Sequence, residues 1–312
     1  THADMGTTHI PVVDAHHHLW DLSQGRYPWL QQDYDPKSFF MGDYAALCQN
    51  FMPSDYRTVS QDCNVVATVH VEAERDRSEQ VAETTWLHAQ FAAHGFPHAV
   101  VAHVWLDRPE TEERLREHLQ YPLVRGIRSK PVTASYPGQS VRGQPGTLQD
   151  PTWLRGLALL NDYGLSWDLR VPYWHLAEAA DVAAQFPTLP IVPHHHGFAW
   201  DRSVDGLKRW RTAMEVLARQ PNVHVKLSEF GLRDHPWDWA ANAAIVHDTL
   251  AIFGWERCMF ASNFPVAGLR IGYKELVSGL HRMLGNLTDA QQRAVMADNA
   301  LKFYRISLPA TT

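Results

Sequence analysis

The chain alternates eight times between a short apolar stretch of strand length and a longer amphipathic stretch of helix length. The apolar stretches lie at residues 10–20, 64–73, 99–105, 124–128, 165–171, 189–195, 222–228 and 257–263. Strands that are each followed by a helix pair in parallel, and eight such units are typical of a TIM barrel. The 312 residues suit one barrel of about 250 residues with insertions. We therefore predict an α/β fold, a (β/α)₈ TIM barrel, as a single domain over residues 1–312.

The segments between these strands predict the helices and two unusual loops. Helices are expected at 78–94, 110–119, 151–163, 174–186, 204–219, 238–253, 273–284 and 288–304, with short helical pieces at 42–50 and 53–63. A long loop at 20–40 is rich in aromatic residues, and a second, polar loop covers 131–149. Long loops in compact domains are usually functional or disordered, and the aromatic content of the first argues against disorder.

Charge, hydropathy and cysteine content exclude several classes of protein. The net charge of -6 argues against nucleic acid or an anionic membrane as the main partner. No apolar run reaches the roughly 18 residues that a membrane helix needs, and Thr1–Gly6 lacks the pattern of a secretory signal. Cys48, Cys63 and Cys258 are far apart, which favours a reducing compartment. We expect a cytoplasmic protein.

Ligand-type side chains follow nearly every predicted strand, where a barrel carries its active site. On the first strand, His16 and His18 point the same way while His17 faces elsewhere, so the pair can converge on one atom. Such pairs bind divalent cations and carry protons near neutral pH. The other polar residues at strand ends are His70, Glu72, His103, Arg128, Asp168, His194, His195, His196, Lys226, Ser228 and Asn263.

Each of these residues also has a purely structural interpretation. His70 and His103 are compatible with buried, hydrogen-bonded core histidines. Asp168 is compatible with a helix cap, and Lys226 with an ammonium that reaches solvent past an apolar surface. The structural interpretation is weak only for the set as a whole.

Several motifs resemble the amidohydrolase superfamily, in particular the branch of sugar-acid lactonases and 2-pyrone-4,6-dicarboxylate lactonase. The first is DAHHHLW at 14–20, which matches the D-x-H-x-H-x-W opening of that branch. The others are VRGIR at 124–128, IVPHHHG at 191–197, NVHVKLS at 222–228, MFASNFPV at 259–266 and NALKFY at 299–304. The resemblance spans the full length of the chain.

The resemblance implies a site and a reaction. His16 and His18, together with Glu72, would hold a divalent metal ion. The ion would be zinc or manganese, and whether the site is occupied stays open. In metal-free relatives the two histidines would instead polarise a substrate carbonyl. His195 matches the sixth-strand histidine of the family. The residues expected to bind substrate are Arg128, Lys226, Trp20, His194 and Asp168. The implied reaction is attack of water on the acyl carbon of a lactone, either a sugar-acid lactone or an aromatic-derived dicarboxylate lactone. The partner is thus a small anionic or hydroxylated molecule, with residues 20–29 as a lid.

Asn263 departs from the family, which has an aspartate general base at this position. An amide oxygen accepts hydrogen bonds but does not take a proton at pH 7. The chain is an Asp→Asn variant, a natural sub-branch with another base, or a protein that binds without catalysis. We favour the second, because SNFPV at 262–266 differs from the usual Ser-Asp-Trp-Pro-Val at two positions and a designed variant would change one. Asn263 is then a catalytic-site residue without the base function, and Glu72 and His195 are the best placed bases.

Two alternatives to a lactonase remain open at this point. The superfamily also contains metal-dependent, non-oxidative decarboxylases of aromatic acids, which release carbon dioxide rather than open a ring. A catalytically silent binding protein would explain Asn263 but not the retained histidines. Loops rich in Trp are also compatible with a homo-oligomer.

Overall fold

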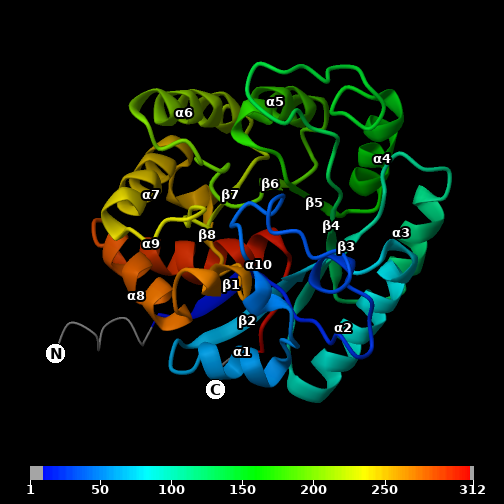
Figure 1. Cartoon of the computed structure of the whole chain (residues 1–312), viewed down its shortest axis with the longest axis horizontal. Helices are drawn as coiled ribbons and strands as arrows, with labels where there is room; N and C mark the ends of the chain where they lie inside the picture. Colours follow the sequence, from blue (N-terminus) through cyan, green and yellow to red (C-terminus); the bar gives the residue numbers. More distant parts are fainter. Residues whose placement is uncertain (1–9, 310–312) are drawn as a thin grey trace.

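The computed structural model describes residues 10–309. The N-terminal segment in which no secretory signal is expected lies outside this range. Helices surround a central group of strands, and the strands follow one another around the molecule in sequence order (Figure 1).

Eight parallel strands form two sheets. The first sheet has the order β1–β2–β3–β4–β5–β6 and the second pairs β7 with β8. The strands are β1 (Val12–His17), β2 (Val65–Val71), β3 (Ala99–His103), β4 (Val124–Arg128), β5 (Ser166–Leu169), β6 (Ile191–Pro193), β7 (Val225–Leu227) and β8 (Cys258–Phe260). Most of their residues are buried, as expected for parallel strands covered by helices on the outside and filled by side chains on the inside.

Isolated bridges close the two sheets into a barrel. On one side, Ile191 pairs with Val223 just before β7. On the other side, His17 pairs with Phe264 just after β8, and the amide of Asn263 donates to the carbonyl of His16 at 2.8 Å. The predicted eight-stranded α/β barrel is therefore confirmed, with β7 and β8 joined to the rest by few backbone bonds.

The Asp14 carboxylate reinforces the junction between β1 and β8. It accepts hydrogen bonds from the Ser262 amide (2.9 Å) and hydroxyl (2.6 Å), and from the hydroxyls of Tyr56 (2.7 Å) and Tyr273 (3.0 Å). All four residues are buried. Asp14 thus connects the first strand to the segment after the eighth and to two outer helices.

The helices agree with the expected positions to within a few residues. They are α1 (Pro53–Val59), α2 (Gln80–His94), α3 (Thr111–Leu119), α4 (Pro151–Asp162), α5 (Leu176–Gln185), α6 (Val204–Ala218), α7 (Trp239–Phe253), α8 (Tyr273–Met283), α9 (Asp289–Arg293) and α10 (Asn299–Phe303). The helix expected at 288–304 is interrupted by a π-helical turn, Ala294–Asp298. The piece expected at 42–50 is reduced to a 3₁₀ turn, Ala45–Leu47.

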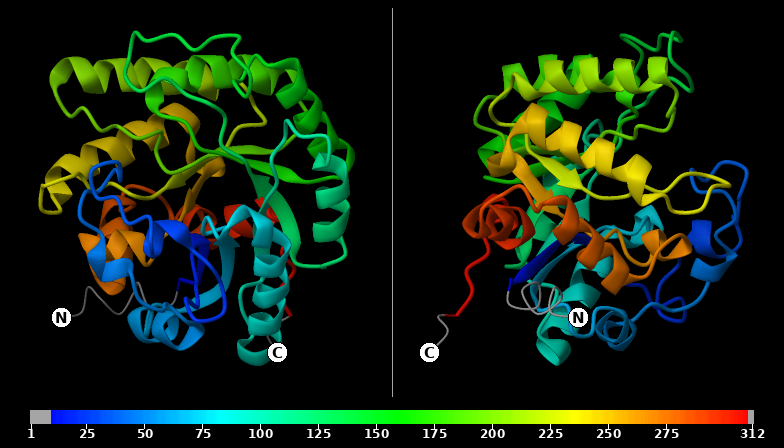
Figure 2. Two further views of the ribbon diagram at one scale, coloured as in Figure 1. Left: turned by 45° about the vertical axis from the view of Figure 1, so that its right-hand side comes forward. Right: turned by 90° about the vertical axis from the view of Figure 1, so that its left-hand side faces the viewer.

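The aromatic loop after β1 is ordered by its own packing. Trp20, Tyr27, Leu30 and Tyr44 are buried in one apolar cluster. The segment projects beyond the strands on the side that faces the viewer in Figure 1 (Figure 2, right). It lies at the end of the barrel where the parallel strands terminate.

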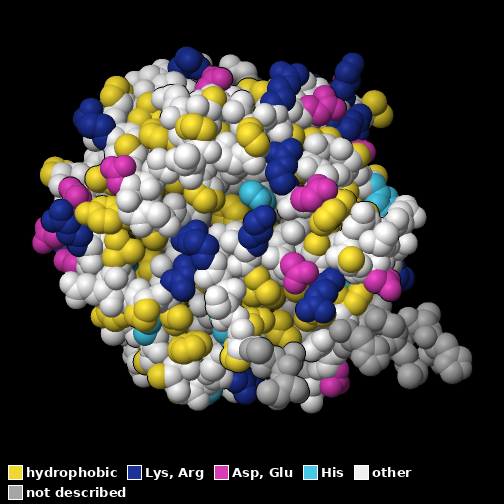
Figure 3. All heavy atoms as spheres, turned by 180° about the vertical axis from the view of Figure 1, so that it is seen from behind, with side chains coloured by type: hydrophobic (Ala, Val, Ile, Leu, Met, Phe, Trp, Pro, Cys, Tyr) yellow, Lys and Arg dark blue, Asp and Glu magenta, His cyan; other side chains and the backbone are white. Residues whose placement is uncertain are grey.

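Other expectations from the sequence concern the surface and the cysteines. Cys48, Cys63 and Cys258 are free thiols. Within residues 10–309, no helix has the length and apolar character needed to cross a bilayer. The face seen from behind has cationic and anionic side chains interspersed (Figure 3). The single-domain assignment, the cytoplasmic location and the absence of a nucleic-acid partner stay predictions.

Candidate active site

A small pocket of about 50 Å³ lies at the C-terminal ends of the strands. The pocket is lined by His16, His18, Trp29, Phe39, Phe40, Ala73, Glu74, Arg128, Lys130, Arg170, His194, His195, Asn263 and Val266. It therefore combines imidazoles, cations and an aromatic wall contributed by the loop after β1.

Three buried imidazoles, those of His16, His194 and His195, converge at the floor of the pocket. One ring nitrogen of each lies within 4.8 Å of the others. Burial lowers the pKa of all three well below the ordinary value for histidine, and the Lys226 ammonium adds to this effect at His16 and His195. The three rings are therefore neutral at pH 7, which is the form that binds metal ions.

A sharp turn after β6 brings two consecutive histidines to the same side. Neighbouring side chains on a strand point in opposite directions, but β6 ends at Pro193 and His195 has a left-handed backbone with φ of 60°. The ring of His194 lies 4.7 Å and that of His195 lies 4.9 Å from the His16 ring. The Ser228 hydroxyl lies 2.6 Å from His195 Nδ1, which leaves Nε2 free.

Lys226 and Asp168 form a buried ion pair below the pocket. Lys226 Nζ lies 2.7 Å from Asp168 Oδ2, and neither side chain is exposed to solvent. The Tyr304 hydroxyl donates to the other Asp168 oxygen at 2.9 Å. Lys226 Nζ also lies 3.0 Å from His16 Nδ1. Asp168 Oδ2 also lies 3.6 Å from His194 Nε2. Neither Lys226 nor Asp168 lines the pocket, so their substrate-binding role stays a prediction.

The donor set fits a divalent metal ion. His16 Nε2 and both His194 nitrogens have no hydrogen-bond partner among residues 10–309. Two nitrogens bound to one zinc ion are about 3.4 Å apart, given Zn–N bonds of about 2.0–2.1 Å in tetrahedral geometry. Because the three nitrogens all lie within 4.8 Å of one another, each pair needs to approach by at most about 1.4 Å.

Lys226 sets one condition on metal binding at His16. A charged ammonium can only donate, so its bond to His16 Nδ1 leaves the ring proton on Nε2. Ligation through Nε2 requires the opposite tautomer, with Lys226 as a neutral amine. His16 is thus an N–H donor toward the pocket in one state and a metal ligand in the other.

His18 lies next to the three imidazoles but outside their group. Its ring is 5.0 Å from that of His16. Its Nδ1 is 2.7 Å from the Val71 carbonyl, so Nδ1 carries the proton and Nε2 keeps its lone pair. Burial, reinforced by nearby Arg128, lowers the pKa of His18 to about 3. The nitrogens that lie close to that of His16 belong to His194 and His195, the two histidines after β6, and not to His18.

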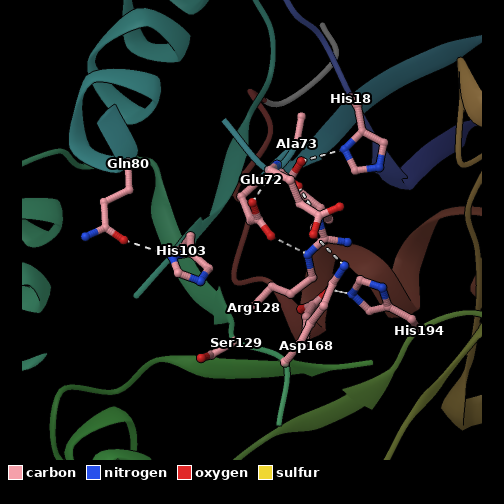
Figure 4. A network of polar contacts seen from close by, with 12 residues as sticks. His18, Glu72, Ala73, Gln80, His103, Arg128, Ser129, Asp168 and His194 are labelled. Carbon is pink, nitrogen blue, oxygen red and sulfur yellow. Dashed lines mark hydrogen bonds and ion pairs between the residues drawn. The ribbon is translucent and has the colours of Figure 1, made fainter. Parts of the chain in front are cut away.

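Glu72 is enclosed by arginines rather than directed into the pocket. Its carboxylate accepts from Arg128 Nε at 2.7 Å and from Arg77 at 2.8 Å (Figure 4). Burial alone would raise the pKa of Glu72, but the two guanidinium groups outweigh it and hold the pKa well below the usual range. Glu72 does not line the pocket. The structure thus places this predicted ligand and base where it orients Arg128.

The pocket has a cationic wall formed by Arg128, Lys130 and Arg170. Lys130 Nζ pairs with Glu74 at 2.8 Å. Arg170 has no ion pair or hydrogen bond within residues 10–309, and its guanidinium lies 5.3 Å from the centre of the Phe198 ring. Sequence reasoning missed Lys130, Glu74 and Arg170. A signal was available for Arg170, because it lies two residues after Asp168 and so projects on the same side of the strand.

Asn263 lines the pocket, and its amide is held from behind by Glu229. Asn263 Nδ2 donates to Glu229 Oε2. Glu229 is buried, and burial raises its pKa to about 7 despite the Asn263 hydrogen bond and nearby Arg270. Glu229 was not identified from the sequence, where it follows the strand motif that ends at Ser228.

The remaining predicted residues lie around the pocket rather than in it. Trp20 is fully buried and donates from Nε1 to the Gln49 carbonyl at 2.7 Å. His70 Nε2 lies 3.2 Å from the Leu19 carbonyl, and His103 Nδ1 lies 2.8 Å from Gln80 Oε1. Of the predicted lid, residues 20–29, Trp29 lines the pocket, and Phe39 and Phe40 from the later part of the same loop line it as well.

Comparisons with known proteins identify relatives that match nearly the whole chain. An uncharacterized protein of Sinorhizobium fredii, y4mH, is 34% identical over 95% of this chain and 99% of its own length. An L-fucono-1,5-lactonase of Burkholderia multivorans is 26% identical, with 96% and 97% covered. The crystal structure of a B. multivorans amidohydrolase with bound zinc has a TM-score of 0.78 at 25% identity and matches 95% of this chain and 100% of that chain. The family model for amidohydrolases matches residues 13–306, so the chain belongs to the amidohydrolase family.

Proposed function

We propose that this protein hydrolyses a lactone that carries a carboxylate group, by attack of water at the acyl carbon. The observation that carries the proposal is that one pocket is bounded by three buried imidazoles and by the cations Arg128, Lys130 and Arg170. The name of the L-fucono-1,5-lactonase relative supports ring opening. The cationic wall favours a lactone with a carboxylate, such as an aromatic-derived dicarboxylate, over a neutral sugar lactone.

The cationic wall binds and orients the substrate carboxylate. Arg128 is fixed by Glu72 through its Nε and by the Glu72 carbonyl through another guanidinium nitrogen. Arg170 offers a guanidinium that no carboxylate neutralises within the described chain. A guanidinium binds a carboxylate through two parallel hydrogen bonds, which fixes the substrate in direction as well as in position. The acyl carbon is thereby held over the imidazoles.

The imidazoles provide electrophilic assistance and a proton acceptor. His16, His194 and His195 would hold a zinc or manganese ion, which polarises an acyl oxygen and lowers the pKa of water when bound. In the tautomer favoured by Lys226, His16 instead directs an N–H toward the pocket. These two uses of His16 exclude each other, and metal analysis of the purified protein distinguishes them.

His18 is the histidine placed to take a proton from the attacking water. Its Nε2 lone pair is free because Nδ1 is bound to the Val71 carbonyl. An anionic tetrahedral intermediate beside the ring would raise its low pKa during the reaction. Trp29, Phe39 and Phe40 cover the site and limit the access of bulk water.

The proposal is tested by product analysis on a panel of compounds. The purified protein, with its metal content determined, is assayed with L-fucono-1,5-lactone, glucarolactone and 2-pyrone-4,6-dicarboxylate, and acid release is followed with a pH indicator. We expect kcat/KM for a carboxylate-bearing lactone to exceed that for the neutral lactone by at least about 10-fold, since charge-assisted hydrogen bonds contribute about 1.5–3 kcal/mol.

Three results would contradict the proposal in different ways. Opening of the neutral lactone alone would refute the carboxylate requirement. Carbon dioxide release from aromatic acids, without ring opening, would assign a decarboxylase. Saturable binding of every compound without turnover would assign a silent binding protein.

A further inference from the structure

Glu229 presents an unusual environment for a carboxyl group inside a protein. It lies two residues after β7, is 2% exposed, and has a left-handed backbone with φ of 53°. No lysine or arginine within residues 10–309 forms an ion pair with it. Its Oε1 has no hydrogen-bond partner there either, and Oε2 accepts from the Asn263 amide.

The surroundings of Glu229 leave Asn263 as its partner. Arg270 is a nearby cation, but its guanidinium donates to the carbonyls of Leu232, Leu269 and Met41. The Glu229 carboxyl therefore does not neutralise Arg270 and does not line the pocket. What it contacts is Asn263, the pocket residue at the position where the family has an aspartate.

The chemistry of the two groups fixes the direction of the amide. Above its pKa of about 7 the Glu229 carboxyl is ionised and only accepts hydrogen bonds, whereas an amide has an accepting oxygen and a donating nitrogen that can exchange places by rotation. Because Glu229 binds Nδ2, the Asn263 oxygen is the atom left for the pocket. That oxygen has no hydrogen-bond partner within the described residues.

We propose that Glu229 is a positioning residue that holds the Asn263 oxygen toward the pocket, and that this oxygen selects ligands with a hydroxyl group at that point. The substrate then has two recognised groups, a carboxylate at the cationic wall and a hydroxyl donor at Asn263. This inference rests on the proposed function for the carboxylate but requires no turnover, because the selection is a property of binding.

The experiment measures binding of acid pairs that differ by one hydroxyl. Malate and succinate, and citrate and tricarballylate, are titrated calorimetrically at pH 8.5 into the wild type, Glu229→Gln and the double variant Asn263→Asp/Glu229→Gln. Glu275→Gln, an exposed carboxyl on α8, is the control. Folding of each variant is verified from its thermal transition.

We expect Glu229→Gln to lose the binding preference for the hydroxylated acid, and the double variant to regain it. The wild type should bind the hydroxylated acid of a pair about 2- to 10-fold more tightly than the acid without the hydroxyl, which is the difference in affinity that one hydrogen bond produces. Glu229→Gln loses this preference, since the side-chain amide introduced there can bind either end of the Asn263 amide. The double variant regains it, because both oxygens of the carboxylate introduced by Asn263→Asp accept and no orientation is needed. A role limited to folding would not produce that rescue.

Two results would overturn the inference. Equal binding of both members of every pair by the wild type would show that no acceptor selects a hydroxyl. Retention of the preference in Glu229→Gln would show that Glu229 does not orient Asn263. Either result is independent of the proposed hydrolysis, which fails instead if acids bind but no lactone is opened.

Discussion

Replacement of Lys226 by Met tests the buried ion pair that supports the site. The substitution removes the partner 2.7 Å from Asp168. Among residues 10–309 the buried carboxylate keeps the hydrogen bond from the Tyr304 hydroxyl and has His194 Nε2 at 3.6 Å. Breaking one side of such a pair costs about 3–5 kcal/mol, because an unpaired charge stays in the protein interior. At about 2 °C per kcal/mol for a chain of this size, we expect the Tm to fall by about 6–10 °C.

The measurement is thermal unfolding of Lys226→Met beside two comparison variants. Lys208→Met, at an exposed position on α6, should change the unfolding free energy by less than about 0.5 kcal/mol. Lys226→Met/Asp168→Asn removes both charges, and should recover at least about 2 kcal/mol of the loss. If the double variant is as unstable as Lys226→Met, the loss comes from packing and the ion-pair argument is refuted.

Three further predictions concern charged groups at the site. Arg170→Gln should raise KM or Kd for carboxylate-bearing ligands about 10-fold or more while the exposed control Arg155→Gln does not; equal affinities in both variants would remove Arg170 from the binding wall. Glu72→Gln should lower kcat/KM without abolishing turnover, since it loosens Arg128 and removes no base; complete loss of kcat with unchanged KM would restore Glu72 as the base. Burial raises the pKa of Glu229 to about 7, so between about pH 4.5 and 7 the folded protein keeps a proton that the unfolded chain has lost. The stability from this proton is present below about pH 4.5 and is lost as the pH rises through 7, by about 3 kcal/mol in total. Glu229→Gln should therefore show a smaller decrease of Tm between pH 5 and 8 than the wild type, and parallel decreases would contradict the raised pKa.

The barrel was predictable because its strands are continuous apolar stretches separated by amphipathic ones. Errors of a few residues in the element boundaries do not change this pattern. It correctly predicted that His16, Arg128 and Asn263 lie at the C-terminal ends of the strands, where the pocket is. The position of a strand end does not determine what its side chain contacts. Asp168 and Lys226 lie at strand ends yet neutralise each other below the pocket.

The grouping of the histidines required backbone geometry that the sequence does not display. Alternation along β1 correctly separates His17, whose ring packs on Tyr56 at 4.5 Å, from His16 and His18. Alternation fails after β6, where the left-handed conformation of His195 directs both His194 and His195 to His16. The role of Glu229 could not be predicted from the sequence, because its partner Asn263 is 34 residues away in the chain and lies next to it only in the folded barrel.

The division of the barrel into a six-stranded and a two-stranded sheet separates two kinds of task. Residues within or directly after β1 to β6 supply the imidazoles and the cationic wall, whereas Lys226, Glu229 and Asn263 belong to the β7–β8 unit. Substitutions in the β7–β8 unit can therefore alter the protonation of His16 and the contact of Asn263 with a ligand hydroxyl, while the cationic wall still binds the ligand carboxylate.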